Sequence, residues 1–415
     1  MVTRWLACRS CGAEFDLGPY FWGCPRCADA SRASPLEVQY DLDQAAPAMR
    51  RALAESDKRG LWGFHPLLPV QEPDVAISLG EGGTPLVRVP RLDDDIGVAA
   101  LYLKNEGQQP TWSWKDRFNA VTIATARELG FSRIVSSSTG NHGASAAAYA
   151  AAAGMRCVVL LPDETPALLG DLIEAYGARA VVTRWQGRGP LLATLVRDYG
   201  WFPATTLAPM PAGSPYGIEG YKTIAYELIQ QSHRAPLDFL FVPVGGGDGL
   251  YGIYKGWREC CSLGLVDDLP RFVACQPVGA NPVVRAIREG HNAVGVVTAA
   301  HSMATSVREE TAGDHVLEAV RASNGLAIDV AENEIRDATR LLARHGLAAE
   351  AASALAVAAL IKASALGLLP EGARVGAVLT SMLLKWPEQL AAIGERPVTI
   401  EPTAEALRQA VAVDA

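Results

Sequence analysis

The sequence predicts an α/β protein whose parallel β-sheets are covered by helices on both faces. Short apolar runs alternate with helical segments of about ten residues or more through most of the chain, a pattern typical of strand–helix–strand units. The chain has 415 residues, 49% hydrophobic and 20% charged, which at about 150 residues per domain allows roughly two to three domains. This composition excludes disordered and fibrous proteins and provides a large buried core.

The alternation is clearest from residue 133 onward. The most apolar stretch, 144–162, is broken by Gly154 and Arg156 and changes from helix-like to strand-like composition, so it predicts a buried helix followed by a strand. Gly177 ends the next helix. The predicted strands are 133–138, 157–162, 239–244, 272–277 and 374–381, and the predicted helices are 142–154, 165–177, 331–345 and 350–366.

Charge and targeting signals limit the partners. The 37 Lys and Arg residues against 45 Asp and Glu give a formal net charge of −8, which disfavours nucleic acid as the main partner. The start, MVTRWLACRSCG, lacks the apolar core of a signal peptide. We therefore expect a cytoplasmic protein with no membrane partner.

Cysteines near the start of the chain predict a metal site. Two C-x-x-C pairs are separated by twelve residues, a spacing typical of a closed tetrahedral zinc site with a structural role. Two disulfides or surface thiols are the alternatives. Residues 1–40 are thus interpreted as a zinc-ribbon-like module. The predicted ligands are Cys8, Cys11, Cys24 and Cys27, whereas Cys157, Cys260, Cys261 and Cys275 lie in apolar contexts and are expected to be core residues.

Four polar segments lie where a strand is followed by a helix, the place where parallel sheets bind ligands. Lys115 stands at the first turn of one such helix, beside tryptophans, where its pKa would be lowered; the alternative is a surface lysine. The loop 136–145 (SSSTGNHGAS) suits a carboxylate, or only caps a helix. The glycine-rich turn 245–249 suits a phosphate, and Thr380 ends a strand with a free hydroxyl.

Together these segments suit pyridoxal 5′-phosphate (PLP), and their order resembles the fold-type II PLP enzymes, in particular the threonine synthase branch. That branch typically carries LGEGNTPL, NPTGSFKDRG, SSTGNTSAS, EGQKTIAFE, VPVGNGGN and LTGHGLKDP. This chain reads SLGEGGTPL, QPTWSWKDRFN, SSTGNHGAS, EGYKTIAYE, VPVGGGDG and LTSMLLKWP. The likeness runs from about residue 60 to 390, and the cysteine pairs recur in many members.

The resemblance implies a fold and an assembly. It implies two three-layer parallel-sheet domains of the tryptophan synthase β type. Residues 41–390 would form the PLP-dependent core, with a smaller subdomain at about 105–205 inserted in a larger one, and 391–415 would be a peripheral tail. Members usually form homodimers.

The resemblance also implies roles for individual residues. Lys115 would hold the cofactor covalently and move the proton at the substrate Cα. Asn141 would bind the cofactor's 3′ oxygen, and Thr380 would face the pyridine nitrogen. The substrate would contact Ser138, Thr139, Gly140 and His142, and the cofactor phosphate would contact Gly245, Gly246, Gly247, Asp248 and Gly249. His142 is either a general acid for the leaving group or a helix-start residue packed on the loop.

Several positions depart from the family pattern. A glycine and a phenylalanine of the family are replaced by Trp112 and Trp114, which predicts a bulkier pocket beside the lysine. The usual NPYR becomes SPYG, so Gly217 stands where the family has an arginine suited to a substrate phosphate. Asp248 in the glycine-rich turn would repel a second phosphate. These changes weaken the case for O-phosphohomoserine as substrate, although Lys222 and Lys385 could supply phosphate contacts or be solvated charges.

The function predicted is that of a threonine-synthase-like PLP-dependent lyase, a carbon–oxygen lyase that eliminates or replaces a β or γ substituent. O-phosphohomoserine or a related activated amino acid is the lead substrate. The alternatives are a serine/threonine dehydratase, a diaminopropionate-type ammonia-lyase and a cysteate-synthase-like β-replacement enzyme. An alternative of another class is a zinc-ribbon interaction protein whose PLP-binding body has no catalytic activity.

Overall fold

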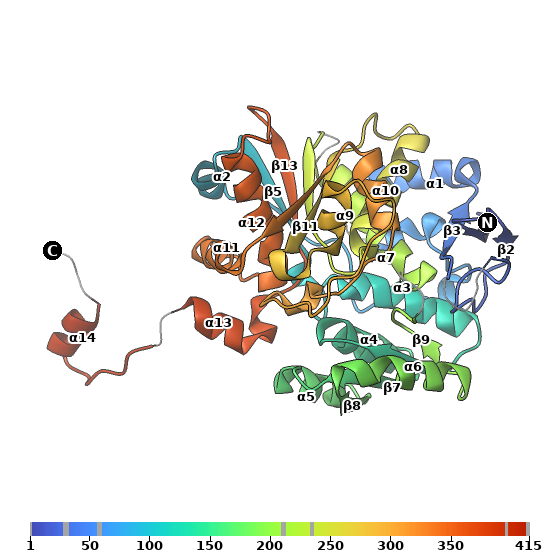
Figure 1. The fold of residues 1–415 in the computed structure, drawn as a ribbon, viewed down its shortest axis with the longest axis horizontal. Helices are drawn as coiled ribbons and strands as arrows, with labels where there is room; N and C mark the ends of the chain where they lie inside the picture. Colours follow the sequence, from blue (N-terminus) through green and yellow to red (C-terminus); the bar gives the residue numbers. More distant parts are fainter. Residues whose placement is uncertain are drawn as a thin grey trace.

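The computed structural model describes residues 2–27, 33–55, 60–208, 213–232, 236–394 and 397–411. These residues form three sheets, two of them almost wholly parallel and flanked by helices, so the predicted α/β class is confirmed. Figure 1 shows the smaller parallel sheet with its green helices below the larger one, with helix α3 between them.

The N-terminal module is a small antiparallel sheet with the order β2-β1-β3. Buried and half-buried residues alternate along β1 and β3, as expected for strands with one covered face. The module packs beside α7 and α8, where the Tyr40 hydroxyl donates to Glu219 Oε2 at 2.9 Å. Its elements are β1 (Arg4–Cys8), β2 (Glu14–Phe15) and β3 (Leu36–Tyr40), followed by α1 (Leu42–Ala54).

The larger sheet has the order β12-β11-β10-β13-β5-β4, and only β4 is antiparallel to its neighbour. Its central strand β10 reads FLFVP and is buried at every position, which is typical of a parallel strand covered on both faces. Its strands are β4 (Leu86–Val87), β5 (Ala100–Asn105), β10 (Phe239–Pro243), β11 (Arg271–Pro277), β12 (Leu326–Val330) and β13 (Arg374–Leu379).

The smaller sheet has the order β8-β7-β6-β9 and is entirely parallel. The apolar stretch 144–162 contains most of helix α4 followed by β7, as predicted. Gly154 and Gly177 follow their helices with left-handed φ of 66° and 84°. Its elements are β6 (Arg133–Ser137), α4 (Asn141–Ala152), β7 (Arg156–Pro162), α5 (Ala167–Ala175), β8 (Arg179–Thr183), α6 (Arg188–Arg197) and β9 (Phe202–Pro203).

The remaining helices cover the sheets. Helix α12 is buried along most of its alanine-rich length beneath the larger sheet, and α14 lies on a tail that extends away from the body in Figure 1. No helix of the described segments combines the length and apolar character needed to cross a bilayer. These helices are α2 (Pro90–Ile96), α3 (Lys115–Glu128), α7 (Pro215–Gln231), α8 (Asp248–Ser262), α9 (Pro282–Arg288), α10 (His315–Ala322), α11 (Glu332–Arg344), α12 (Ala351–Ala365), α13 (Pro387–Ile393) and α14 (Ala404–Ala410).

Short 3₁₀ turns join these elements. Two of them matter for the site: η4 (Trp185–Gly187) precedes α6, and η6 (Thr305–Val307) precedes α10. The others are η1 (Leu61–Leu67), η2 (Pro73–Val75), η3 (Glu106–Gln108), η5 (Val278–Ala280) and η7 (Leu383–Lys385).

Candidate active site

A cavity of about 310 Å³ brings the four predicted segments together. It lies where β6, β10 and β13 end and where α3, α4 and α8 begin, which is the ligand-binding edge of parallel sheets. Of the predicted cofactor and substrate residues, all except Gly140 line it. The other lining residues include Trp114, Phe118, Arg188, Thr205, Thr206, Tyr221, Ser306, Glu309, Thr311 and Glu350.

Lys115 is the first residue of α3 and extends into this cavity. Its Nζ lies 5.7 Å from the ring centroids of both Trp114 and Tyr221. Burial lowers the pKa of Lys115 below its usual value, and nearby carboxylates, Asp248 foremost, oppose that shift. Among the residues that the structure describes, no acceptor bonds to this Nζ. An amine in this state is suited to attack an aldehyde.

The loop after β6 turns sharply into α4. The Ser138 hydroxyl accepts hydrogen bonds from the backbone N–H groups of Gly140 at 2.9 Å and Gly143 at 2.8 Å, so it caps the helix start. Gly140 has a φ of 144°, and a Cβ there would lie 2.4 Å from Leu169 Cδ1, so only glycine fits. These contacts fix the conformation of the loop, and Thr139 lines the cavity.

Asn141 connects this loop to η6 and to the start of α12. Its Nδ2 donates to Glu350 Oε2 at 2.9 Å and to Ser306 Oγ at 3.2 Å, whereas its buried Oδ1 has no partner in the described part of the chain. Glu350 is 1% exposed and also accepts from Trp386 Nε1. A buried polar atom without a partner at a cavity wall indicates a place for a ligand donor.

His142 is held by its neighbours as a neutral imidazole. Burial, reinforced by the Lys115 charge, lowers the pKa of His142 to about 3. Its Nε2 lies 2.6 Å from the Ala204 carbonyl oxygen, which can only accept, so Nε2 carries the proton and Nδ1 does not. The Phe118 ring packs edge-on at 4.9 Å. This geometry favours the packed helix-start interpretation over the general acid.

The glycine-rich turn begins α8. Gly247 has a left-handed φ of 101°, and a Cβ at Gly246 would meet open space within 4 Å. A Cβ at Gly249 would lie 2.3 Å from the Trp114 indole, so the turn and the lysine segment pack directly on each other. The Asp248 carboxylate accepts from the backbone N–H of Gly213 at 3.0 Å and lies 3.3 Å from His315 Nε2. The Asp248 carboxylate, which also lines the cavity, thus joins the turn to Gly213 and to the start of α10.

The predictions for Trp112 and for the two phosphate-binding lysines need correction. Trp114 lines the cavity, as predicted. Trp112 does not line it and is 41% exposed, so the prediction that Trp112 makes the pocket bulkier is wrong. Neither candidate phosphate lysine lines the cavity or is solvated. Lys222 pairs with Glu219 and Glu259 at 2.6 and 2.9 Å, and Lys385 donates to the Thr111 carbonyl at 2.8 Å. Both ammonium groups are therefore buried and already bonded to acceptors within the protein.

Thr380 directly follows β13 and lines the cavity. Its Oγ1 shares a hydrogen bond with Ser353 Oγ at 2.9 Å, and its carbonyl accepts from the Trp114 N–H at 2.9 Å. A neutral hydroxyl rather than a carboxylate therefore faces the cavity at this point.

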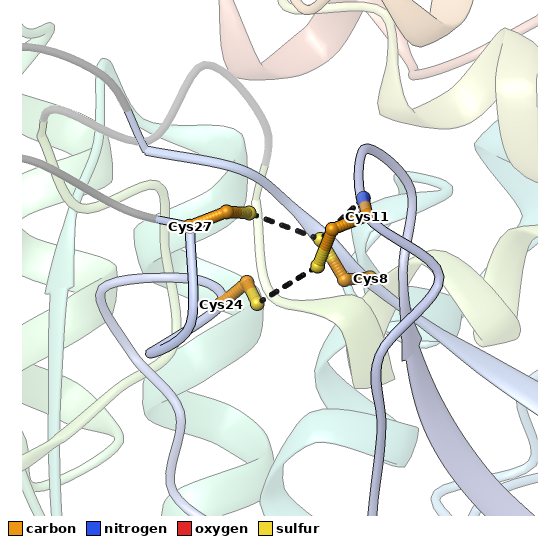
Figure 2. A group of neighbouring side chains, drawn as sticks. All are labelled: Cys8, Cys11, Cys24 and Cys27. Carbon is orange, nitrogen blue, oxygen red and sulfur yellow. Dashed lines mark hydrogen bonds between the residues drawn. The ribbon is translucent and has the colours of Figure 1, made fainter.

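The four N-terminal cysteines form a second candidate site (Figure 2). Their sulfur atoms all lie within 4.8 Å of one another, with Cys8–Cys27 at 3.5 Å and Cys11–Cys24 at 3.8 Å. The thiols are free, so the disulfide alternative is not what the structure shows. Zn–S bonds of about 2.3 Å at tetrahedral angles place sulfurs about 3.8 Å apart, so the donor set fits zinc.

Sequence reasoning missed several cavity residues, four of which can ionise: Arg188, Tyr221, Glu309 and Glu350. Glu350 could have been noticed as the one charge at the start of an otherwise apolar, alanine-rich helix. Tyr221 lies within EGYKTIAYE, which was recognised as a motif but not assigned to the site. Arg188 and Glu309 are in segments without a motif, and no local signal distinguishes them from surface charges.

Comparisons with known proteins agree with this geometry. Residues 77–381 match the sequence model of the family described as "Pyridoxal-phosphate dependent enzyme". Threonine synthase of Methanosarcina acetivorans is 34% identical over 409 residues, 98% of both chains. That of Methanocaldococcus jannaschii is 33% identical over 401 residues, 95% of this chain and 96% of its own.

Solved structures show the same fold. Threonine deaminase isoform 2 from Solanum lycopersicum has a TM-score of 0.66 at 19% identity, covering 89% of this chain and 95% of its own. Maize serine racemase has a TM-score of 0.62 at 21% identity, covering 72% and 89%. The chain belongs to the pyridoxal-phosphate dependent enzymes, as a threonine synthase-like lyase with the fold-type II architecture.

Proposed function

We propose that this lyase eliminates or replaces a β or γ substituent of an α-amino acid, with O-phosphohomoserine or a related activated amino acid as the lead substrate. The observation that carries the proposal is the Lys115 amine, which has no hydrogen-bond acceptor among the described residues and faces the glycine-rich turn across one cavity. The extensive identity with two threonine synthases supports the choice of lead substrate.

The residues around the cavity fit PLP in distinct ways. The N–H groups of the turn 245–249, where Gly246 leaves open space, would hold the phosphate at the start of α8. The unpartnered Oδ1 and the Glu350-bound Nδ2 of Asn141 would orient the 3′ oxygen side of the ring. When bound, the cofactor supplies an aldehyde that joins the substrate amine and a ring that makes the Cα proton acidic.

The chain's own groups would then bind the substrate and move its proton. Ser138, Thr139 and Gly140 would hold the substrate carboxylate at the start of α4. Lys115, whose pKa is lowered by burial, would accept the Cα proton as a neutral amine and return it. Thr380 would face the ring nitrogen with a neutral hydroxyl supported by Ser353, which favours loss of a leaving group over transamination.

A second function is favoured by the cavity's acidic lining. Asp248, Glu309 and Glu350 face the same space, and Gly217 supplies no arginine there. Such a cavity would also suit a dehydratase or ammonia-lyase acting on serine, threonine or diaminopropionate, or a cysteate-synthase-like β-replacement enzyme acting on an unphosphorylated amino acid. His142, neutral and with Nδ1 unprotonated, fits these reactions as a contact rather than as an acid.

Product analysis separates the candidates. Purified protein loaded with PLP would be incubated with O-phosphohomoserine, O-phosphoserine, serine, threonine and diaminopropionate, and phosphate, keto acid and ammonia would be measured. Threonine and phosphate from O-phosphohomoserine support the lead. Keto acid without phosphate release supports the second function. Failure of borohydride to fix PLP on Lys115 contradicts both. PLP fixed on Lys115 with none of these products formed supports the interaction protein whose PLP-binding body has no catalytic activity.

We further propose that Cys8, Cys11, Cys24 and Cys27 bind a structural Zn²⁺ and that the protein is a cytoplasmic homodimer. The zinc proposal is supported by the sulfur spacing and by two N–H groups, of Ser10 and Cys11, that donate to Cys8 Sγ at 3.4 and 3.5 Å. Metal analysis should find one zinc per chain, lost in Cys24→Ser. Sedimentation should give twice the chain mass.

A further inference from the structure

Arg188 reaches the candidate active site from a segment that the sequence motifs do not cover. It is the first residue of α6, in the smaller subdomain, and it lines the same cavity as Lys115. Its guanidinium lies over the Trp185 ring, 4.1 Å from the ring centroid, and its Nε donates to the Trp185 carbonyl at 3.4 Å. Within the described ranges, neither of its Nη groups has a hydrogen-bond or ion-pair partner.

The neighbouring Arg308 packs on the same ring but has an ion-pair partner. Arg308 also lies over Trp185, at 5.0 Å, but its Nη2 pairs with Glu164 Oε2 at 2.6 Å. That pair fastens the segment after η6 to the smaller subdomain. Packing on the Trp185 ring orients the Arg188 guanidinium, while its Nη groups remain unpaired. These groups are therefore positioned to form two parallel hydrogen bonds to an anionic ligand.

The cavity around Arg188 contains hydroxyl groups that favour an anionic ligand and a carboxylate that disfavours a highly charged one. Thr206 and Thr311 line the same cavity with hydroxyl groups that can donate, whereas the Thr205 hydroxyl donates to the Ser137 carbonyl at 3.1 Å. Glu309 also lines it, and its Cγ would lie 3.3 Å from a Cβ built on Gly245, so its carboxylate lies beside the proposed phosphate turn. Arg188 and Glu309 do not form an ion pair with each other, which leaves the arginine's charge available.

We propose that Arg188 is a specificity-determining residue that binds the anionic group at the far end of the substrate side chain. In the lead substrate this group is the phosphate ester. The inference rests on the proposed function and deepens it, because Arg188 supplies from α6 the cation that Gly217 lacks. Glu309 opposes this contact, so the two residues set the preference between anionic and neutral substituents.

The test is a ratio of two substrates that differ in the charge of the leaving group. We would measure kcat/KM for O-phosphohomoserine and for O-acetylhomoserine with wild type, Arg188→Gln, Arg188→Lys and Glu309→Gln. Arg188→Gln should lower the ratio at least about tenfold, mainly through KM, since a charge-assisted hydrogen bond is lost. Arg188→Lys should fall between, and Glu309→Gln should raise the ratio.

A matched control lies on the same helix. Arg197 is in the last turn of α6 and outside the cavity, so Arg197→Gln should leave the ratio unchanged. Binding of 2-amino-5-phosphonopentanoate and of norvaline, followed by cofactor absorbance, gives the same comparison without turnover. An unchanged ratio in Arg188→Gln, with PLP bound and either substrate processed, overturns the inference alone. A protein that takes up no PLP overturns the proposed function and this inference together.

Discussion

Helix α3 carries two cations, Lys115 and Arg117, in opposite surroundings. The Arg117 guanidinium is fully buried and pairs with Glu106 at 2.7 Å and with Glu227 at 2.6 Å. Lys104 completes this network through Glu227 at 2.6 Å. The Lys115 amine, two residues earlier on the same helix, has no hydrogen-bond acceptor among the described residues and lies 5.7 Å from the ring centroids of Trp114 and Tyr221. We call the first group the closed network and contrast it with the open cavity.

The difference teaches how to tell a structural charge from a functional one. Residues two apart on a helix point to nearly opposite faces, so one helix can serve a sealed interior and a ligand site at once. In the closed network the partners lower the pKa of Glu227 to about 2 and raise that of Arg117. In the open cavity, burial instead lowers the pKa of Lys115. Ionisable groups with a pKa shifted in this way are typical of functional sites.

The largest expected effect separates activity from stability at Lys115. Lys115→Met should reduce turnover at least about 10³-fold, because the amine acts on the reacting atoms. The free energy of unfolding of the cofactor-free protein should stay equal or rise, since a desolvated amine without acceptor is replaced by an apolar chain of similar length. Urea denaturation of cofactor-free samples measures it. Marked destabilisation would show that Lys115 has a structural role.

Arg117 should behave in the opposite way. Arg117→Met leaves Glu106 and Glu227 as buried carboxylates without their main partner, which is expected to lower the free energy of unfolding by about 3–5 kcal/mol. Urea denaturation again measures it. Arg127→Met, exposed in the last turn of the same helix, is the matched control and should change stability by less than about 0.5 kcal/mol. Equal effects of the two substitutions would contradict the contrast.

The parts that sequence alone predicts are those governed by local chemistry. The strands and helices between 133 and 177 follow from apolar periodicity and from Gly154 and Gly177, and the structure confirms them within a few residues. The convergence of Lys115, the α4 loop, the glycine-rich turn and Thr380 follows from their common position at strand ends.

The parts that sequence does not predict depend on contacts between distant segments. Lys222 and Lys385 look like free cations in sequence, and only the packing of α7 on α8 and of η7 on the segment before α3 shows that each is buried with acceptors. Arg188 is the converse: nothing nearby in sequence distinguishes it from Arg184 or Arg197. Which cation remains unpaired is decided by tertiary structure.

Lys385 lies between the two extremes and gives a pH-dependent effect. It is 4% exposed with one carbonyl acceptor, and burial lowers its pKa to about 8. Because the unfolded lysine titrates near 10.4, the unfolded state binds more protons above pH 8, and stability should rise with pH there. From pH 7.5 to 9.5, wild type should gain about 2 kcal/mol relative to Lys385→Met. A flat difference would show that Lys385 titrates normally.

The smallest expected effect on stability concerns the backbone at Trp112, in the loop before α3. Trp112 has a left-handed φ of 59°, held by its carbonyl, which accepts from the Met382 N–H at 3.1 Å and the Ser381 hydroxyl at 3.0 Å. A side chain in this conformation costs about 1 kcal/mol that glycine avoids. Trp112→Gly should therefore be about 1 kcal/mol more stable than Trp112→Ala in thermal or urea unfolding, because both lose the indole and differ in backbone freedom. If the alanine variant is the more stable, the strand-to-helix connection before Lys115 relaxes its φ when the indole is removed, and the loop is less rigid than the closed network beside it.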